Sequence, residues 1–128
     1  MTNHHKILLV EDDEINAKLI KDFLTYKGYT IILTNNGNEV KGLVEREVPA
    51  LILMDIQIFG KSGVDVAADL RSDVSTKAIP IFAVSAFSQK KVLTPEQSEL
   101  FDEYIEKPIR FAEFTAILAS YLKEGKGV

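Results

Sequence analysis

The stretch that decides the fold is Lys6-Ile7-Leu8-Leu9-Val10-Glu11-Asp12-Asp13, an apolar run that ends in acidic residues. A short continuous apolar run is typical of a strand that is buried on both faces, as the strands of parallel sheets are. Apolar positions then recur at helical spacing from Ile15 to Leu24, and Gly28 is suited to ending that helix. The stretch therefore predicts the first strand and helix of an α/β domain.

The same order of apolar run and helical pattern repeats along the chain, which favours a parallel sheet covered by helices. The pattern is weakest from Phe87 to Glu103, where Thr94-Pro95-Glu96-Gln97 has the residues of a helix start. We predict a short helix there, over residues 95–101. The other strands are expected at Thr30 to Thr34, Leu51 to Met54, Ile81 to Val84 and Tyr104-Ile105, and the other helices around Val40 to Val44, Val64 to Leu70 and Phe111 to Tyr121.

Length and composition indicate one domain. A chain of 128 residues with 46% hydrophobic residues can build one core but not two. We expect a single domain over residues 1–128, with a core from about 5 to 123 and flexible ends at 1–4 and 124–128. His4 and His5 are expected to be solvated rather than metal ligands, because they lack partners at ligand spacing.

Charge and cysteine content narrow the location and the partners. The formal net charge of −4 argues against direct binding to nucleic acid, which needs a basic surface. No apolar run approaches the roughly 20 residues that span a bilayer, and no secretory signal pattern precedes the first strand. The chain has no cysteine and hence no disulfide framework. We therefore expect a cytoplasmic protein that does not contact the membrane.

Five polar residues stand where the chain leaves the predicted strands: Asp12, Asp13, Asp55, Ser85 and Lys107. The carboxyl ends of parallel strands meet at one edge of a sheet, where open α/β sheets bind ligands. Each residue alone has an ordinary explanation, since acidic residues cap helices, aspartate occurs in turns, and most lysines lie on the surface. Independent caps would not need to converge, so the joint pattern predicts a site.

The residue types of this site suit metal-assisted phosphoryl transfer. Carboxylates a few ångströms apart repel each other by about 1 kcal/mol in water, and by more at low dielectric. Bound Mg²⁺ removes that repulsion, and it prefers one or two carboxylates together with water and phosphate oxygens. A carboxylate can itself be the nucleophile and form an aspartyl phosphate, while an ammonium and a hydroxyl stabilise the phosphoryl oxygens.

Four motifs resemble those of bacterial response-regulator receiver domains, and the resemblance covers essentially the whole chain. It implies an α/β fold of the doubly wound, flavodoxin-like (βα)5 type, with five parallel strands in the order 2-1-3-4-5 and helices on both faces. It also implies a stand-alone receiver of the chemotaxis or cell-division type. The motifs are Ile7-Leu8-Leu9-Val10-Glu11-Asp12-Asp13, Leu53-Met54-Asp55-Ile56-Gln57, Ala83-Val84-Ser85-Ala86 and Tyr104-Ile105-Glu106-Lys107-Pro108-Ile109.

The resemblance implies a role for each residue of the predicted site. Asp55 would accept a phosphoryl group from a histidine kinase or a histidine phosphotransfer protein. Mg²⁺ would be held by the carboxylates of Asp12, Asp13 and Asp55, joined by the backbone carbonyl of Gln57. Lys107 would pair with the phosphoryl group, and the protein would catalyse only its own phosphorylation and dephosphorylation.

The resemblance also implies a switch that changes the binding of a downstream partner protein. Ser85 would move toward the phosphoryl oxygen, and Tyr104 would follow it inward. The peptide bond between Lys107 and Pro108 would be cis, which proline allows at a penalty of about 0.5–1 kcal/mol. Phe87, two residues past Ser85, would shield the phosphoryl group from water and lengthen its lifetime.

Two segments depart from the family pattern. Ile58-Phe59 stands where receivers commonly carry Met-Pro, so the loop from Gln57 to Lys61 is expected to be more mobile. Leu100-Phe101 stands where a small residue or glycine usually ends the fourth helix, so that helix end is open to change. We expect the side chains of Phe59 and Phe101 to pack against the domain.

Three alternatives remain open at this stage. The chain could be a receiver excised from a larger regulator or hybrid kinase. It could be a phosphatase-like hydrolase that forms an aspartyl phosphate, although such enzymes usually need an acid where this chain has Gln57. A flavin-binding module is disfavoured because the acidic residues after the first strand would repel a phosphate. For a receiver, we expect a monomer or a weak homodimer.

Overall fold

The computed structural model describes residues 5–122, which form one five-stranded parallel sheet with helices on both faces. The ends expected to be flexible, residues 1–4 and 124–128, lie outside the described residues. The strands are β1 (Lys6–Val10), β2 (Thr30–Thr34), β3 (Leu51–Asp55), β4 (Ile81–Ser85) and β5 (Glu103–Glu106). The helices are α1 (Glu14–Tyr26), η1 (Gly37–Glu39), α2 (Val40–Glu47), α3 (Gly63–Arg71), α4 (Gln89–Val92), α5 (Pro95–Ser98) and α6 (Phe111–Leu122).

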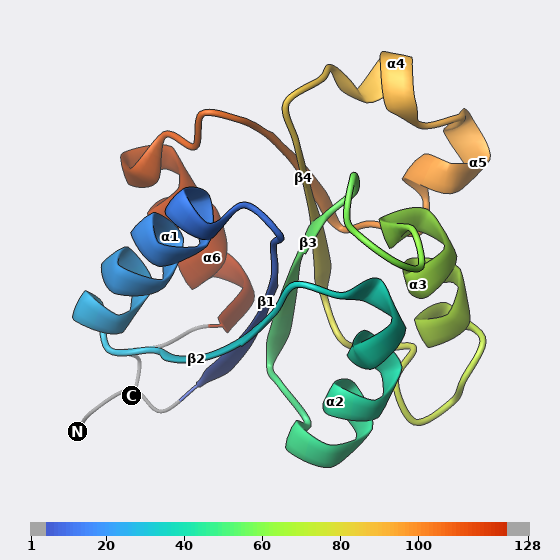
Figure 1. Cartoon of the computed structure of the whole chain (residues 1–128), viewed down its shortest axis with the longest axis horizontal. Helices are drawn as coiled ribbons and strands as arrows, with labels where there is room; N and C mark the ends of the chain where they lie inside the picture. Colours follow the sequence, from blue (N-terminus) through green and yellow to red (C-terminus); the bar gives the residue numbers. More distant parts are fainter. Residues whose placement is uncertain (1–4, 123–128) are drawn as a thin grey trace.

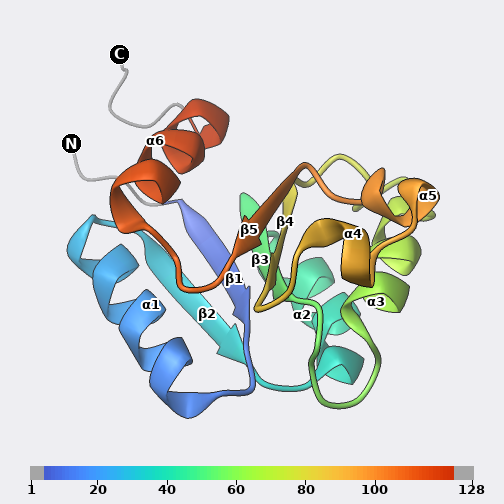
Figure 2. The same cartoon turned by 90° about the horizontal axis from the view of Figure 1, so that it is seen from above.

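The strand order is β2-β1-β3-β4-β5, and every neighbouring pair is parallel. This confirms the predicted α/β fold and its 2-1-3-4-5 order. Helices α1 and α6 cover one face of the sheet, and α2, α3, α4 and α5 lie on the other (Figure 1; Figure 2). The chain crosses to the second face between β1 and β3, so the edge between their carboxyl ends is the topological switch point where such sheets bind ligands.

Alternate residues of β1 and β3 enter two separate cores. In β1, Ile7 and Leu9 pack on the side of α1 and α6, whereas Leu8 and Val10 pack on the side of α2 and α3. All residues of β3 and β4 are buried. A fully buried aliphatic side chain contributes about 1.5–3 kcal/mol through removal from water, so the central strands dominate the stability of the fold.

The strand register brings the carboxyl ends of the strands level with one another. Val10 of β1 lies opposite Met54 of β3, so the residues that follow each of them emerge together. On the other side, Asp55 lies opposite Val84, and the next residue, Ser85, lies opposite Glu106. The register therefore explains why polar residues that end the strands, Asp55 and Ser85 among them, lie at one edge of the sheet.

The segment from Phe87 to Glu103 forms two short helices instead of the single short helix that the sequence predicts. The predicted start of the second one is confirmed, because Thr94 and Gln97 form a reciprocal capping box. The predicted extent is wrong, since α5 ends at Ser98 rather than at residue 101. Four residues per helix leave most backbone groups to turns, so this segment depends on contacts with the rest of the domain.

Arg71 at the end of α3 supplies those contacts. Its guanidinium donates to the backbone carbonyl of Leu100 at 2.9 Å and pairs with Asp102 at 2.8 Å. The same Asp102 carboxylate accepts the backbone N–H of Ile81 at the start of β4. Arg71 therefore fixes the chain after α5, where a terminal glycine was expected in the family pattern. The side chain of Phe101 is partly buried against the core, as predicted.

Candidate functional site

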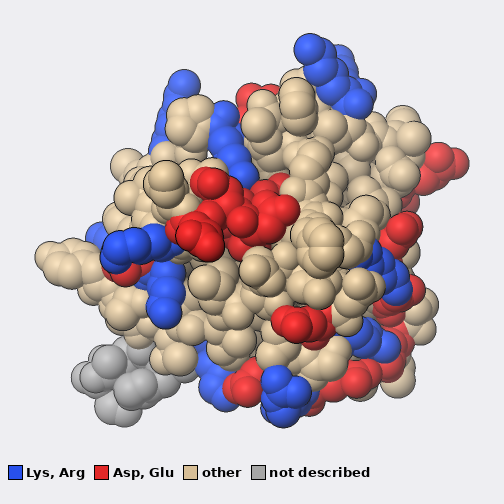
Figure 3. Space-filling view, in the orientation of Figure 1, with Lys and Arg blue, Asp and Glu red and all other residues tan. Residues whose placement is uncertain are grey.

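Three carboxylates meet at the carboxyl edge of the sheet. Glu11 and Asp12 directly follow β1, and Asp55 is the last residue of β3. One carboxylate oxygen from each lies within 4.8 Å of the others. Glu11 and Asp55 are only 2% and 5% exposed, whereas Asp12 faces solvent. The exposed acidic side chains form a patch over the end of β1 (Figure 3).

Lys107 brings a positive charge to this group from the loop after β5. Its Nζ lies 3.1 Å from Asp55 Oδ2 and 3.1 Å from Glu11 Oε1. The backbone N–H of Lys107 donates to the carbonyl of Ser85 at 2.8 Å, which sets the lysine beside β4. The peptide bond between Lys107 and Pro108 is cis, as predicted. The predicted meeting of Asp55 with Lys107 is therefore present in the structure.

The buried Glu11 carboxyl is electrostatically the most perturbed group of the site. Burial and the neighbouring Asp55 raise the pKa of Glu11 from its usual 4.5 to about 7, although the Asp13 N–H and Lys107 act in the opposite direction. For Lys107, burial works against the charge, but the hydrogen bonds that its ammonium donates to Asp55 and Glu11 outweigh this effect and raise the pKa. The ammonium therefore stays charged and neutralises only part of the acidic group.

The donor set fits a hard divalent cation. Carboxylate oxygens are the ligands that Mg²⁺ prefers, and it commonly uses one or two of them plus water and phosphate oxygens. Three carboxylates beside one ammonium leave negative charge uncompensated, which is the condition that a bound cation relieves. Glu11, Asp12 and Asp55 are accordingly the residues that could hold Mg²⁺.

Asp13 takes a different position from the one that the sequence interpretation gave it. Its carboxylate caps α1 by accepting the backbone N–H of Asn16 at 3.0 Å. Glu11, which the interpretation missed, occupies the acidic group instead. The backbone N–H of Glu11 donates to the Thr34 carbonyl at 3.0 Å, so sheet pairing continues one residue beyond Val10. That continued pairing fixes the Glu11 side chain, and the length of the apolar run alone does not reveal it.

A chain of three hydrogen bonds links the loops after β3 and β4 to β5. The hydroxyl of Ser85, which is fully buried, donates to Gln57 Oε1 at 3.1 Å. Ser85 Oγ also accepts the backbone N–H of Phe87 at 3.1 Å. The hydroxyl of Tyr104 in turn donates to the Phe87 carbonyl at 2.6 Å. The two residues predicted to form the switch are therefore connected through Phe87, a residue that is itself 52% exposed.

The loop after β3 is tied to the carboxylates by two backbone donors. The N–H of Gln57 donates to Asp55 Oδ1 at 3.0 Å, and the N–H of Phe59 donates to Asp12 Oδ2 at 3.2 Å. These bonds give the loop defined partners although it lacks the usual proline. The prediction that the Phe59 side chain packs against the domain is wrong, because 69% of it is exposed.

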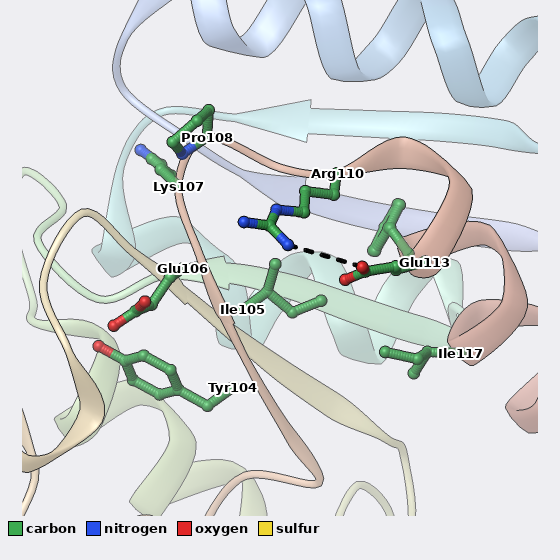
Figure 4. A pocket seen from close by; sticks show the side chains of 9 residues that line it. Tyr104, Ile105, Glu106, Lys107, Pro108, Arg110, Glu113 and Ile117 are labelled. Atoms are coloured by element: carbon green, nitrogen blue, oxygen red, sulfur yellow. Dashed lines mark ion pairs between the residues drawn. The ribbon is translucent and has the colours of Figure 1, made fainter.

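A hollow on the outer side of β5 lies next to the site but is chemically distinct from it (Figure 4). It contains the ion pair of Arg110 and Glu113, whose side chains are 3.7 Å apart and largely exposed. Figure 4 shows the ammonium of Lys107 pointing away from this pair. Its partners are the carboxylates of Glu11 and Asp55, which are not drawn in that view. The hollow is lined by Tyr104, Ile105, Glu106, Lys107, Pro108, Arg110, Glu113, Phe114 and Ile117.

The fold and this site define a class of protein: an α/β domain with an acidic, lysine-containing site at the carboxyl edge of a 2-1-3-4-5 sheet. The chain belongs to the response regulator receiver domain family, whose sequence profile matches residues 7–119. It is thus a signalling domain of two-component systems rather than a conventional enzyme.

Curated relatives place the chain near small regulators of this family. It is 39% identical over 116 residues to the polar-differentiation response regulator DivK of Brucella anthropi, covering 91% of this chain and 94% of the relative. The corresponding protein of Brucella ovis is 38% identical over the same shares. The relatives are bacterial, and the chain spans nearly their whole length.

Solved structures agree on the fold. A CheY-like receiver domain from Methylobacillus flagellatus has a TM-score of 0.83 and 29% identity, covering 93% of this chain and 99% of that one. The response regulator TrrA of Thermotoga maritima, solved in complex with Mg²⁺ and beryllium fluoride, has a TM-score of 0.81 and 29% identity, covering 91% and 98%. Within residues 5–122, no helix is long and apolar enough to cross a membrane.

Proposed function

We propose that Asp55 accepts a phosphoryl group from the phosphohistidine of a histidine kinase or of a histidine phosphotransfer protein. The observation that carries this assignment is the position of the Asp55 carboxylate, held 3.1 Å from the Lys107 ammonium and beside the other two carboxylates. Asp55 is buried, and it is the last residue of the central strand β3. A phosphoryl donor can approach this position along the edge of the sheet.

The chemistry proposed for the chain is a direct displacement at phosphorus. An Asp55 oxygen forms the new P–O bond while the P–N bond to the donor histidine breaks, and the nitrogen keeps that electron pair. Lys107 stabilises the phosphoryl oxygens as negative charge gathers on them. Bound Mg²⁺ would supply further neutralisation and hold the phosphoryl oxygens in place. Transfer of the phosphoryl group from Asp55 to water would release inorganic phosphate and return the Asp55 carboxylate to its starting state.

The proposed ligands of Mg²⁺ are Glu11, Asp12 and Asp55, with the backbone carbonyl of Gln57 as a further oxygen. Asp13 is not included, because its carboxylate is engaged at the start of α1. The support for a cation is the excess of carboxylate over ammonium charge and the raised pKa of Glu11. The structure of the TrrA protein with Mg²⁺ and beryllium fluoride is consistent with this proposal for the present chain.

The proposed output is a change in partner binding through Ser85 and Tyr104. A phosphoryl group on Asp55 offers strong acceptor oxygens that compete for the Ser85 hydroxyl. When that hydroxyl turns away from Gln57, the chain of hydrogen bonds through Phe87 is disturbed, and Tyr104 is free to move inward. A downstream protein would then bind the altered surface.

Phe87 is proposed to slow the loss of the phosphoryl group by limiting the approach of water. Its backbone N–H donates to the hydroxyl of Ser85, which keeps this bulky residue next to the end of β4. Phosphate release from the loaded protein, followed over time, is expected to be faster in Phe87→Ala. Equal rates in the two proteins would remove Phe87 from this role.

The decisive experiment is phosphorylation by a small donor. Incubation with Mg²⁺ and acetyl phosphate or a phosphoramidate is expected to add one phosphoryl group, seen as a shift in intact mass. Asp55→Asn should show no adduct, whereas Asp13→Asn should still be modified. No adduct on the unaltered chain, or an adduct that survives Asp55→Asn, would overturn the assignment. Steady turnover of a phosphate ester would favour the hydrolase alternative, although Gln57 offers no general acid.

The remaining assignments follow from the phosphoryl chemistry. The proposed location is the cytoplasm, where the ATP that charges a histidine kinase is found. The proposed partners are that kinase or a phosphotransfer protein and one downstream protein, with no direct contact to nucleic acid or membrane. The receiver is proposed to act as a single domain, as a monomer or a weak homodimer.

A further inference from the structure

The loop after β2 contains none of the site's carboxylates, but it contacts the loop after β3, which lies against them. The segment Asn36–Asn38, between β2 and α2, lies alongside the segment Phe59–Lys61, between β3 and α3 (Figure 2). The backbone N–H of Gly37 donates to the Phe59 carbonyl at 2.9 Å. On its other side, the N–H of Phe59 donates to Asp12 Oδ2 at 3.2 Å. The backbone of Phe59 thus links Gly37 to the Asp12 carboxylate of the site.

The contact is closer than any side chain would permit. A Cβ atom on Gly37 would lie 1.9 Å from the backbone oxygen of Lys61 and 2.9 Å from its carbonyl carbon. Real Cβ atoms are never found so near to other atoms, and a backbone group cannot rotate away as a side chain can. Any side chain at position 37 must therefore push the segment Phe59–Lys61 outward.

Both partners of this contact are anchored elsewhere. The Asn36 carboxamide oxygen accepts the N–H of Asn38 at 2.9 Å, and the Asn36 N–H donates to the hydroxyl of Thr34 in β2 at 3.3 Å. On the opposite side, the Lys61 side chain pairs with Asp69 of α3. Because both segments are held in place, a side chain at position 37 cannot be accommodated by moving the two together. The segment Phe59–Lys61 is displaced instead, and with it the Phe59 N–H that donates to Asp12.

We propose that Gly37 is a positioning residue for the metal and phosphoryl site, acting through the Phe59 peptide on Asp12. This proposal rests on the proposed function of the Asp55 site. Gly37 does not contact the carboxylates itself. Because it has no side chain, Gly37 allows the two backbones to approach closely. This approach holds the loop after β3, which carries the proposed Gln57 ligand, at a fixed position beside the end of β1. Outer partners that orient metal ligands typically change metal affinity by about 10–100-fold.

The test compares two glycine-to-alanine variants of the full chain. Gly37→Ala is expected to bind Mg²⁺ about tenfold more weakly than the unaltered protein in calorimetric titration at fixed pH. Gly42→Ala is the matched control, because a Cβ on Gly42 in α2 meets no atom within 4 Å, and it should bind Mg²⁺ as the unaltered chain does. Both titrations are run where circular dichroism shows the protein to be folded.

A second measurement separates positioning from general loss of structure. The rate of phosphorylation by acetyl phosphate is followed against Mg²⁺ concentration. Gly37→Ala is expected to raise the half-saturating Mg²⁺ concentration while the rate at saturating Mg²⁺ stays near that of the unaltered protein. A general structural defect would lower the saturated rate and leave the half-saturating concentration unchanged, which would overturn the proposal.

The remaining outcomes also decide. Should Gly37→Ala fail to fold, Asn36→Ala removes the side chain that braces the same loop, and it should weaken Mg²⁺ binding by a few-fold. Mg²⁺ affinity equal to that of the unaltered chain, in whichever of these variants folds, would overturn the role of Gly37. Absence of Mg²⁺ binding or of an Asp55 adduct in the unaltered chain would instead overturn the proposed function on which this inference rests.

Discussion

If Glu11 is a metal ligand, as proposed, its carboxyl group should couple metal binding to protons. Because burial and Asp55 raise its pKa to about 7, a large fraction of Glu11 is protonated at pH 6, and nearly all is ionised at pH 8. A carboxylate that binds a metal must be ionised, so Mg²⁺ held by Glu11 would displace that proton. We expect Mg²⁺ affinity to rise between pH 6 and pH 8, with proton release on binding near pH 7.

Calorimetry in two buffers of different ionisation enthalpy measures that proton release. Glu11→Gln is expected to bind Mg²⁺ more weakly at pH 8 and to lose most of the dependence between pH 6 and pH 8. An affinity in the unaltered chain that is flat over this range would contradict the role of Glu11 as a titrating ligand.

The same pKa shift predicts how the metal-free fold responds to pH. The pKa of Glu11 is higher in the native state than its usual 4.5, so the native state binds more protons than the unfolded chain between about pH 4.5 and 7. The contribution of Glu11 to the free energy of unfolding is therefore fully present below pH 4.5 and is lost as the pH rises through 7. Urea unfolding in EDTA should show a smaller fall in unfolding free energy from pH 5.5 to 7.5 in Glu11→Gln than in the unaltered chain. An equal fall would contradict the assignment.

Val48 has a strained backbone conformation, and a substitution at this position can relieve the strain without touching the carboxylate site. It ends α2 in the left-handed conformation, with φ +48°, and 70% of it is exposed. A branched residue costs about 1–2 kcal/mol in that region, whereas glycine fits it. We expect Val48→Gly to raise the unfolding free energy by about 1 kcal/mol in urea titration, without a change in Mg²⁺ affinity. A lower unfolding free energy would mean that packing of the valine outweighs the strain.

At the scale of elements, most of the fold was predictable because its strands are nearly continuous apolar runs. The segment between β4 and β5 was not, since it forms two four-residue helices held by Arg71 from α3. That contact joins residues 29 positions apart, which a local pattern cannot show. The same reason explains the exchange of Asp13 for Glu11: the pairing of Glu11 with Thr34 of β2 is a long-range contact.

We expect the hydrogen-bond chain between the loops of β3, β4 and β5 to favour the unphosphorylated arrangement. Each such bond contributes about 0.5–1.5 kcal/mol, so loss of one changes a two-state equilibrium by roughly twofold to tenfold. Gln57→Leu removes the acceptor of the Ser85 hydroxyl. We expect it to increase the population with Tyr104 turned inward before phosphorylation, seen as a shift of the Tyr104 ring resonances toward those of the loaded protein.

Tyr104→Phe tests the other end of the same chain. It removes the donor to the Phe87 carbonyl, so the ring resonances at position 104 should lie close to those of the same variant after phosphorylation. If the Tyr104 resonances do not move in Gln57→Leu, and phosphorylation moves the ring of Tyr104→Phe as far as it moves the ring of the unaltered chain, these bonds do not hold the switch.

At the scale of the whole molecule, the site joins residues that lie far apart in the chain. Glu11 follows β1, Asp55 ends β3, and Lys107 follows β5, so the ion pairs of Lys107 link three strands across the sheet. A ligand that binds only when these strands are in place must stabilise the complete fold. The added stability is set by mass action and reaches about 2.7 kcal/mol at a ligand concentration one hundred times the dissociation constant.

The site's occupancy should therefore be visible in thermal unfolding. We expect Mg²⁺ alone to raise the melting temperature. Mg²⁺ together with beryllium fluoride, the combination bound in the TrrA structure, should raise it by several degrees more. Asp55→Asn should keep part of the first increase, since Glu11 and Asp12 remain, and should lose the second. Lys107→Ala should retain the Mg²⁺ increment but show a smaller one with beryllium fluoride, because the cation that pairs with the bound anion is gone. An equal beryllium fluoride increment in Asp55→Asn would place that ligand, and with it the phosphoryl group, somewhere other than Asp55.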